Sequence, residues 1–136
     1  MHAVPAAAPL KILLVDDNTL NLMVARLQIG KLWPYADITQ AGSGPQALQQ
    51  LQLQDFDLAL IDMLMPGMDG PELTTRIRQL PQRSKADLPI VGLTANSHSQ
   101  EIERCLTAGM DAVAPKPIDP EKLVHCVNLA LQRRRT

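Results

Sequence analysis

Short apolar segments alternate with segments of helical periodicity along most of the chain. Five short apolar runs predict β-strands, at residues 11–15, 36–40, 57–61, 88–93 and 111–114. These runs are too continuously apolar for strands that face water on one side. The pattern therefore indicates a parallel sheet that helices cover on both faces.

Helices are predicted between these runs from capping residues and from apolar side chains three or four positions apart. The predicted N-terminal caps carry short polar side chains that can accept a backbone hydrogen bond: Asn18, Ser43, Asp69, Ser97 and Asp119. Gly109 predicts the end of the fourth helix. The apolar stripe expected in that helix is formed by Ile102, Cys105 and Leu106. In the last helix, the residues expected to face the core are Leu123, Val127, Ala130 and Leu131.

The alternation of strand and helix repeats about five times in 136 residues, a length that fits one domain. Five such units predict an α/β, single-domain, flavodoxin-like (βα)5 fold, a doubly wound parallel sheet with strand order 2-1-3-4-5. We expect residues 10–132 to form this domain. Residues 1–9 are expected to be a linker or a vector-derived remnant, and residues 133–136 a solvated, basic C-terminal tail.

The composition gives no sign of a strongly charged binding surface. The formal net charge is −1, so no global field attracts nucleic acid or an anionic membrane. Cys105 and Cys126 do not have a C-x-x-C spacing and are expected to be free thiols in a reducing cytoplasm. No apolar run approaches the roughly 18 residues of a membrane span. We therefore expect a cytoplasmic domain with no direct contact to nucleic acid or membrane.

Polar side chains stand at the carboxyl ends of four of the five predicted strands. In a doubly wound sheet, ligands bind beyond these ends. The first strand is followed by Asp16 and Asp17, the third by Asp62, the fourth by Thr94 and the fifth by Lys116. The fold is expected to bring these five side chains to one rim of the sheet.

Three carboxylates gathered at one rim repel each other and call for a cation. Two unit charges about 4 Å apart repel by about 4 kcal/mol at an effective dielectric constant near 20. An all-oxygen ligand set favours Mg²⁺. Together with the Lys116 charge and the Thr94 hydroxyl, the set predicts a phosphoryl-transfer site. Asp62 is the expected nucleophile, because a carboxylate can form an aspartyl phosphate.

Four motifs, all in order and at the predicted strand ends, resemble those of the receiver domains of two-component signalling. They are L-V-D-D-N at 14–18, D-M-L-M-P-G-M-D-G at 62–70, P-I-V-G-L-T-A-N at 89–96 and A-G-M-D-A-V-A-P-K-P-I at 108–118. The resemblance covers the chain from about Leu10 to Leu131. The loop motifs are most similar to those of receivers attached to hybrid sensor histidine kinases.

The resemblance implies a role for each acidic residue of the rim. Asp62 matches the phosphoacceptor. Asp17 matches a direct Mg²⁺ ligand, Asp16 matches its partner, and Leu64 is expected to give its backbone carbonyl to the same ion. The cofactor that the resemblance implies is therefore Mg²⁺.

The resemblance also implies roles for residues on the fourth and fifth strands. Thr94 matches the hydroxyl that follows the phosphoryl group, and Lys116 matches the lysine that pairs with Asp62 and then with the phosphate. The Lys116–Pro117 bond matches a peptide that is cis in the family. Most receivers carry an aromatic switch residue three positions before the lysine, and this chain has Val113 there. We expect a smaller conformational readout from Thr94 and Val113 for this reason.

The function implied by the resemblance is that of a phosphoacceptor in a phosphorelay. The domain would take a phosphoryl group from a histidine kinase or histidine-phosphotransfer domain and signal through a change in conformation or partner binding. It would catalyse its own phosphorylation and dephosphorylation as a monomer or weak dimer. A single-domain regulator and the excised receiver of a hybrid kinase both fit, and the second is favoured; its parent would then be a membrane-bound sensor.

The alternatives divide on a few residues. A Mg²⁺-dependent phosphatase with an aspartate nucleophile needs a second aspartate two residues later, where this chain has Leu64. A calcium loop fails at the same position, because Leu64 has no side-chain oxygen. A flavodoxin-type cofactor binder would need an aromatic pocket and a phosphate loop. The remaining alternative is a degenerate receiver that acts as a phosphorylation-independent interaction module. Because Leu64 cannot orient a water, we also expect slow hydrolysis of the acyl phosphate.

Overall fold

The computed structural model describes residues 10–95 and 98–135 of the chain. Five strands form one parallel sheet in the order β2-β1-β3-β4-β5, which confirms the predicted topology. Along the chain these strands are β1 (Lys11–Val15), β2 (Asp37–Ala41), β3 (Leu58–Asp62), β4 (Ile90–Thr94) and β5 (Ala112–Pro115).

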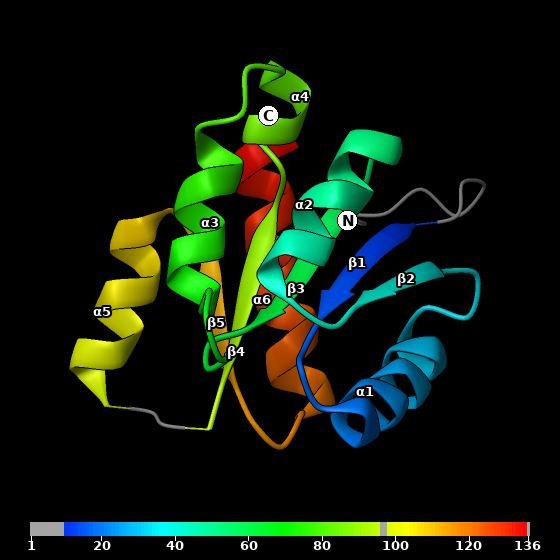
Figure 1. Ribbon diagram of the computed structural model, residues 1–136. Coiled ribbons are helices and arrows are strands. Elements are labelled where there is room, and N and C mark those ends of the chain that lie inside the picture. The colour runs from blue at the N-terminus through cyan, green and yellow to red at the C-terminus, as the bar shows by residue number, and fades with distance from the viewer. Residues whose placement is uncertain (1–9, 96–97, 136) are drawn as a thin grey trace.

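Helices cover both faces of the sheet, as Figure 1 shows. In chain order they are α1 (Thr19–Leu32), α2 (Gly44–Leu53), α3 (Gly70–Arg78), α4 (Arg83–Ala86), α5 (Ser99–Ala108) and α6 (Pro120–Arg135). The single turn α4 was not predicted. It buries none of its residues, so it carries no apolar periodicity that a sequence pattern could reveal.

Two apolar clusters fill the space on the two sides of the sheet. In one, helices α1 and α6 pack against the strands, and the four predicted core residues of α6 are all buried. In the other, α2, α3 and α5 pack against the opposite face. The central strands β1, β3 and β4 supply side chains to both clusters, which explains their continuously apolar sequences.

Most of the predicted helix ends are confirmed by their hydrogen bonds. Asn18, Ser43 and Asp69 each accept a bond from the backbone of the residue three positions later. Asp119 accepts bonds from the first turn of α6, and Gly109 ends α5 with a φ of 116°. The cap predicted at Ser97 lies outside the described residues.

Three local predictions were wrong. Asp62 was expected just past the sheet but is the last residue of β3, in register with Leu93, because the ladder continues to the Met63 backbone. Leu106 was expected in the apolar stripe of α5 but is 45% exposed. Cys105 is the one residue of that predicted stripe that is buried. Arg134 was expected to be solvated but donates to Asp111 at 2.6 Å.

Three smaller features concern the edge strand, the cysteines and the lengths of the helices. Pro115 lies on the edge strand β5, where a missing backbone N–H does no harm to the ladder. Cys105 and Cys126 are free, as predicted, and both are buried. None of the helices in the described part of the chain is both long and apolar enough to cross a membrane.

Candidate functional site

Three carboxylates meet at the carboxyl end of the sheet. Oxygen atoms of Asp16, Asp17 and Asp62 all lie within 4.8 Å of one another. Asp16 and Asp62 are buried, at 5% exposure each, whereas Asp17 faces solvent. The sheet order explains the meeting, because β1 and β3 are neighbours and their carboxyl ends point the same way. Carboxylate oxygens at this spacing suit a hard divalent cation such as Mg²⁺.

Lys116 supplies the positive charge of the site. Its Nζ lies 3.1 Å from Asp62 Oδ1 and 3.7 Å from Asp16 Oδ2. Burial raises the pKa of Asp62 above its ordinary value, and the negative charge of Asp16 adds to this effect. The hydrogen bond from Lys116 and its charge act in the opposite direction without cancelling the burial effect. The Lys116–Pro117 peptide that follows is cis, the conformation that the family resemblance implied.

Thr94 ends β4 beside these residues and is buried. Its carbonyl accepts a 2.7 Å bond from the Lys116 backbone, which ties the two predicted residues together. Its hydroxyl points to the Met63 sulfur at 3.7 Å. Sulfur is a weak acceptor, so this contact costs little to give up when a stronger acceptor is offered. The sequence pattern gave no sign of this contact.

The loop between β3 and α3 closes the site from one side. The Leu64 backbone hydrogen-bonds to the Asp62 carboxylate, and the Leu64 side chain is 63% exposed. Gly70 brings the loop back against the strand, because a Cβ there would lie 2.6 Å from the Asp62 carbonyl oxygen. The Gly70 N–H donates to the Met63 carbonyl at 2.9 Å, which fixes both ends of the loop.

An apolar groove of about 210 Å³ leads away from the site between α1 and the loop after β5. Asp16 and Lys116 lie at its inner end, with Leu20 and Val24 along its wall. The outer side of α1 continues this surface with an exposed apolar stripe of Leu20, Met23, Val24 and Leu27. Sequence reasoning missed the stripe. Its signal is that α1 has more apolar positions than the single inward face requires.

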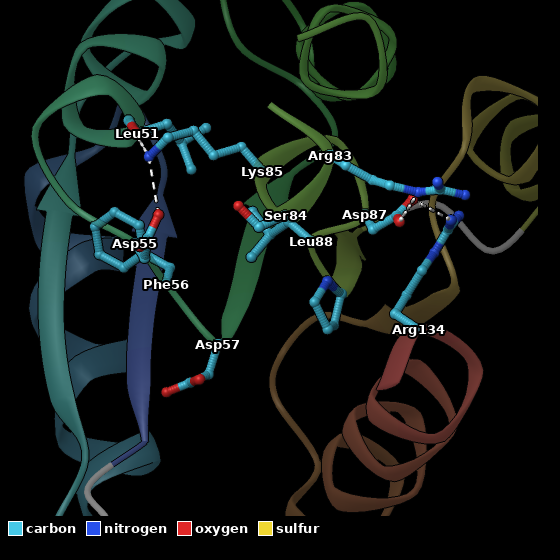
Figure 2. A pocket seen from close by; sticks show the side chains of 11 residues that line it. Leu51, Asp55, Phe56, Asp57, Arg83, Ser84, Lys85, Asp87, Leu88 and Arg134 are labelled. Atoms are coloured by element: carbon cyan, nitrogen blue, oxygen red, sulfur yellow. Dashed lines mark hydrogen bonds and ion pairs between the residues drawn. The ribbon is translucent and has the colours of Figure 1, made fainter. Parts of the chain in front are cut away.

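A second pocket, of about 400 Å³, lies at the opposite end of the strands. Figure 2 shows charged side chains around its rim that reach toward one another rather than into the cavity. Lys85 pairs with Asp55, and Asp87 pairs with Arg83 and Arg134. Because these charges are already matched, we do not assign this pocket a catalytic role.

A comparison with protein families matches residues 12–128 to the response regulator receiver domain. This chain belongs to that family. Among curated proteins, the receiver is 38% identical over 124 residues to the sensor histidine kinase RcsC of Escherichia coli K12, covering 91% of this chain. It is 37% identical over 118 residues to the sensor histidine kinase GacS of Pseudomonas protegens, covering 86% of this chain. The receiver spans 12% and 13% of the lengths of these two relatives.

Solved structures agree with the family and the fold. A putative response regulator from Chloroflexus aurantiacus superposes with a TM-score of 0.83 at 32% identity, covering 93% of this chain and 100% of that one. The receiver domain of the sensor histidine kinase PA1611 from Pseudomonas aeruginosa superposes with a TM-score of 0.79 at 32% identity, covering 92% and 99%. That receiver has a magnesium ion coordinated in its active site cleft.

Proposed function

We propose that this receiver domain takes a phosphoryl group from a phosphohistidine onto Asp62 in a Mg²⁺-dependent reaction. The observation that carries the proposal is the 3.1 Å ion pair between Lys116 and Asp62 within a cluster of three carboxylates. A lysine and a cation on either side of one carboxylate are suited to a group that brings negative charge of its own. Asp62 is the reactive carboxylate of the cluster, because it ends the central strand β3, between the carboxylates that follow β1 and the lysine that follows β5.

The donor set fits the cation that the family implies. Asp16, Asp17 and Asp62 would hold Mg²⁺, with the backbone carbonyl of Leu64 as a further oxygen ligand. When bound, Mg²⁺ would neutralise the carboxylate cluster and stabilise the charge on the transferred phosphoryl oxygens. The receiver of PA1611 supports this assignment, because it has a magnesium ion at its active site cleft and is 32% identical to this chain.

Asp62, Lys116 and Thr94 each have one role in the reaction. An oxygen of Asp62 attacks phosphorus, and the new P–O bond forms as the P–N bond to the donor's imidazole breaks. The imidazole, protonated on its other nitrogen, keeps the electron pair of the P–N bond and leaves as a neutral ring. Lys116 then shifts its contact from Asp62 to a phosphoryl oxygen, and the Thr94 hydroxyl donates to another in place of its contact with Met63.

The donor is a histidine kinase or a histidine-phosphotransfer domain that docks over α1. The groove beside Asp16 and Lys116 opens directly onto the exposed stripe of α1 that contains Leu20 and Leu27. An apolar helix face of the donor can bury this stripe and present its phosphohistidine at the inner end of the groove. The parent protein would then be a hybrid sensor kinase with this domain on its cytoplasmic side.

A Mg²⁺-dependent labelling experiment separates this function from that of a degenerate receiver. A phosphodonor should label the wild-type chain when Mg²⁺ is present, and both chelation and the Asp62→Asn substitution should abolish the label. Equal labelling of wild type and Asp62→Asn would refute the proposal. A wild-type chain that takes no label from any donor, while it still binds a signalling partner, would support the degenerate receiver.

A further inference from the structure

The loop that carries Leu64 rests on the first residue of α2. This loop, residues 63–69, is fixed at its ends by the bonds from Met63 to Leu93 and from Gly70 to Met63. Its middle turns at Gly67, where φ is 82°. Met68, in the returning half, is partly buried and packs against the cluster below α2 and α3.

Gly44 and Met68 touch more closely than any side chain at position 44 would allow. A Cβ built on Gly44 would lie 2.5 Å from Met68 Sδ and 2.9 Å from both Cβ and Cγ of Met68. The end of a methionine side chain can move away, but its Cβ moves only with the backbone of the loop. Gly44 is buried and helical with no positive φ, so space alone requires glycine here.

We infer that Gly44 and Met68 are positioning residues that set where the Leu64 backbone lies, and thereby the affinity of the carboxylate cluster for Mg²⁺. The inference rests on the proposed function, in which the Leu64 carbonyl is a ligand. A methyl group at position 44 would displace Met68 and the loop half that contains it. The Leu64 backbone, which also bonds to Asp62, would move with the loop.

Calorimetric titration of the full chain with Mg²⁺ tests the inference directly. Gly44→Ala should weaken Mg²⁺ binding by about tenfold, as loss of support behind a metal ligand typically does. The NMR amide shift of Leu64 should change in the metal-free variant. Gly30→Ala is the matched control, because it also adds a methyl to a helical glycine but has no atom within 4 Å of the new Cβ. Its Mg²⁺ affinity should equal that of wild type.

Met68→Ala provides a second test that does not depend on how Gly44→Ala folds. Truncation removes the anchor of the loop and should also weaken Mg²⁺ binding. Met68→Ala keeps the Cβ that a methyl group at position 44 would meet at 2.9 Å. In the double variant, Gly44→Ala should therefore still weaken Mg²⁺ binding, but by less than in the wild-type background, because two of the three close atoms are gone. If the wild-type chain binds Mg²⁺ and neither substitution changes its affinity, this inference is overturned, but the proposed function is not. A wild-type chain that does not bind Mg²⁺ would overturn the proposed function, and this inference with it.

Discussion

Asp62 is buried at 5% exposure, and its ionised form therefore loses hydration that the unfolded chain retains. Its pKa is raised by this burial in spite of Lys116. A folded-state pKa above the unfolded value means that the folded chain holds the proton more tightly. Stability therefore falls as pH rises from the ordinary aspartate value, about 3.9, through the raised pKa.

Asp62→Asn should consequently raise the melting temperature of the metal-free protein at neutral pH. We expect a gain of about 3 °C, the shift that about 1 kcal/mol produces in a domain of this size. The gain should shrink as pH is lowered toward 4, because wild-type Asp62 then becomes protonated. Calorimetric melting in chelator across this range measures both effects. A lower melting temperature for Asp62→Asn at pH 7 would contradict this account of the burial penalty.

Leu64 presents an exposed apolar side chain beside Asp62, the proposed phosphoacceptor. It cannot hydrogen-bond to a water that approaches the acyl phosphate, so spontaneous hydrolysis should be slow. Leu64→Asn keeps the backbone ligand and adds a polar group that can orient this water. We expect the phosphorylated variant to lose its label several-fold faster than wild type. An unchanged half-life, with labelling intact, would show that the side chain at this position does not limit hydrolysis.

At the scale of elements, the Asp111 carboxylate links three of them, β4, α3 and α6, at the far end of the sheet. Its side chain is fully buried and accepts bonds from the Ile90 backbone at 2.9 Å, Arg78 at 3.2 Å and Arg134 at 2.6 Å. Burial lowers the pKa of Arg78 to about 10, with the charge of Arg134 as the next cause. The pair of arginines is thus tolerated only with the carboxylate between them.

Asp111→Ala should therefore cost about 3–5 kcal/mol of unfolding free energy, the usual loss when one partner of a buried ion pair is removed. Asp87→Ala is the control, because Asp87 pairs with Arg83 and Arg134 near the surface and should cost at most about 1 kcal/mol. Urea unfolding measures both. If Asp111→Ala does not fold, Asp111→Asn should still be clearly less stable than Asp87→Ala. Equal losses at the two positions would contradict this role for Asp111.

In the proposed function, strands β4 and β5 transmit the state of the site without an aromatic side chain at position 113. Val113 is half-buried against the cluster under α2, α3 and α5 and has no ring that could turn inward. We expect the backbones around Thr94 and Val113 to be nearly identical with and without a phosphate mimic. Structures of both states provide the measurement. A large inward shift of β5 would show that a ring is not required for the switch.

The sequence predicted the elements well because periodicity and caps are local signals. It missed α4, which has no buried face, and it placed the end of β3 one residue early. A carboxylate normally marks the end of an apolar strand, yet the ladder holds Asp62 in register with Leu93. The partnership of Arg134 with Asp111 was missed for a different reason, because it joins residues 23 positions apart through tertiary packing.

The candidate site was predictable because parallel strands gather their carboxyl ends at one rim. All five predicted side chains lie there, contributed by four strands. The spacing of residues in the sequence could not predict the packing that holds these side chains in place, such as the contact of Met68 with Gly44. A Cβ added at position 44 would lie less than 3 Å from Met68, and sequence patterns do not resolve such distances.

Across the whole molecule, the exposed stripe of α1 is the face that we propose for docking of the phosphodonor. Leu20→Glu should slow phosphotransfer from a histidine-phosphotransfer domain by about tenfold, which corresponds to about 1.4 kcal/mol of lost binding. Labelling by a small acyl phosphate should change little. Leu53→Glu is the control, since Leu53 is 71% exposed, against 66% for Leu20, but lies at the far end of α2. Equal slowing by both substitutions would argue against a docking face on α1.

In the proposed function, Asp62 itself receives the phosphoryl group. The most direct measurement is mass spectrometry of the chain after phosphotransfer from a phosphohistidine donor, with the acyl phosphate reduced by borohydride to mark the modified residue. We expect a single mark at Asp62 that requires Mg²⁺ and disappears in Lys116→Met or Asp62→Asn. A mark at another residue, or one at Asp62 that forms equally well in chelator, would contradict it.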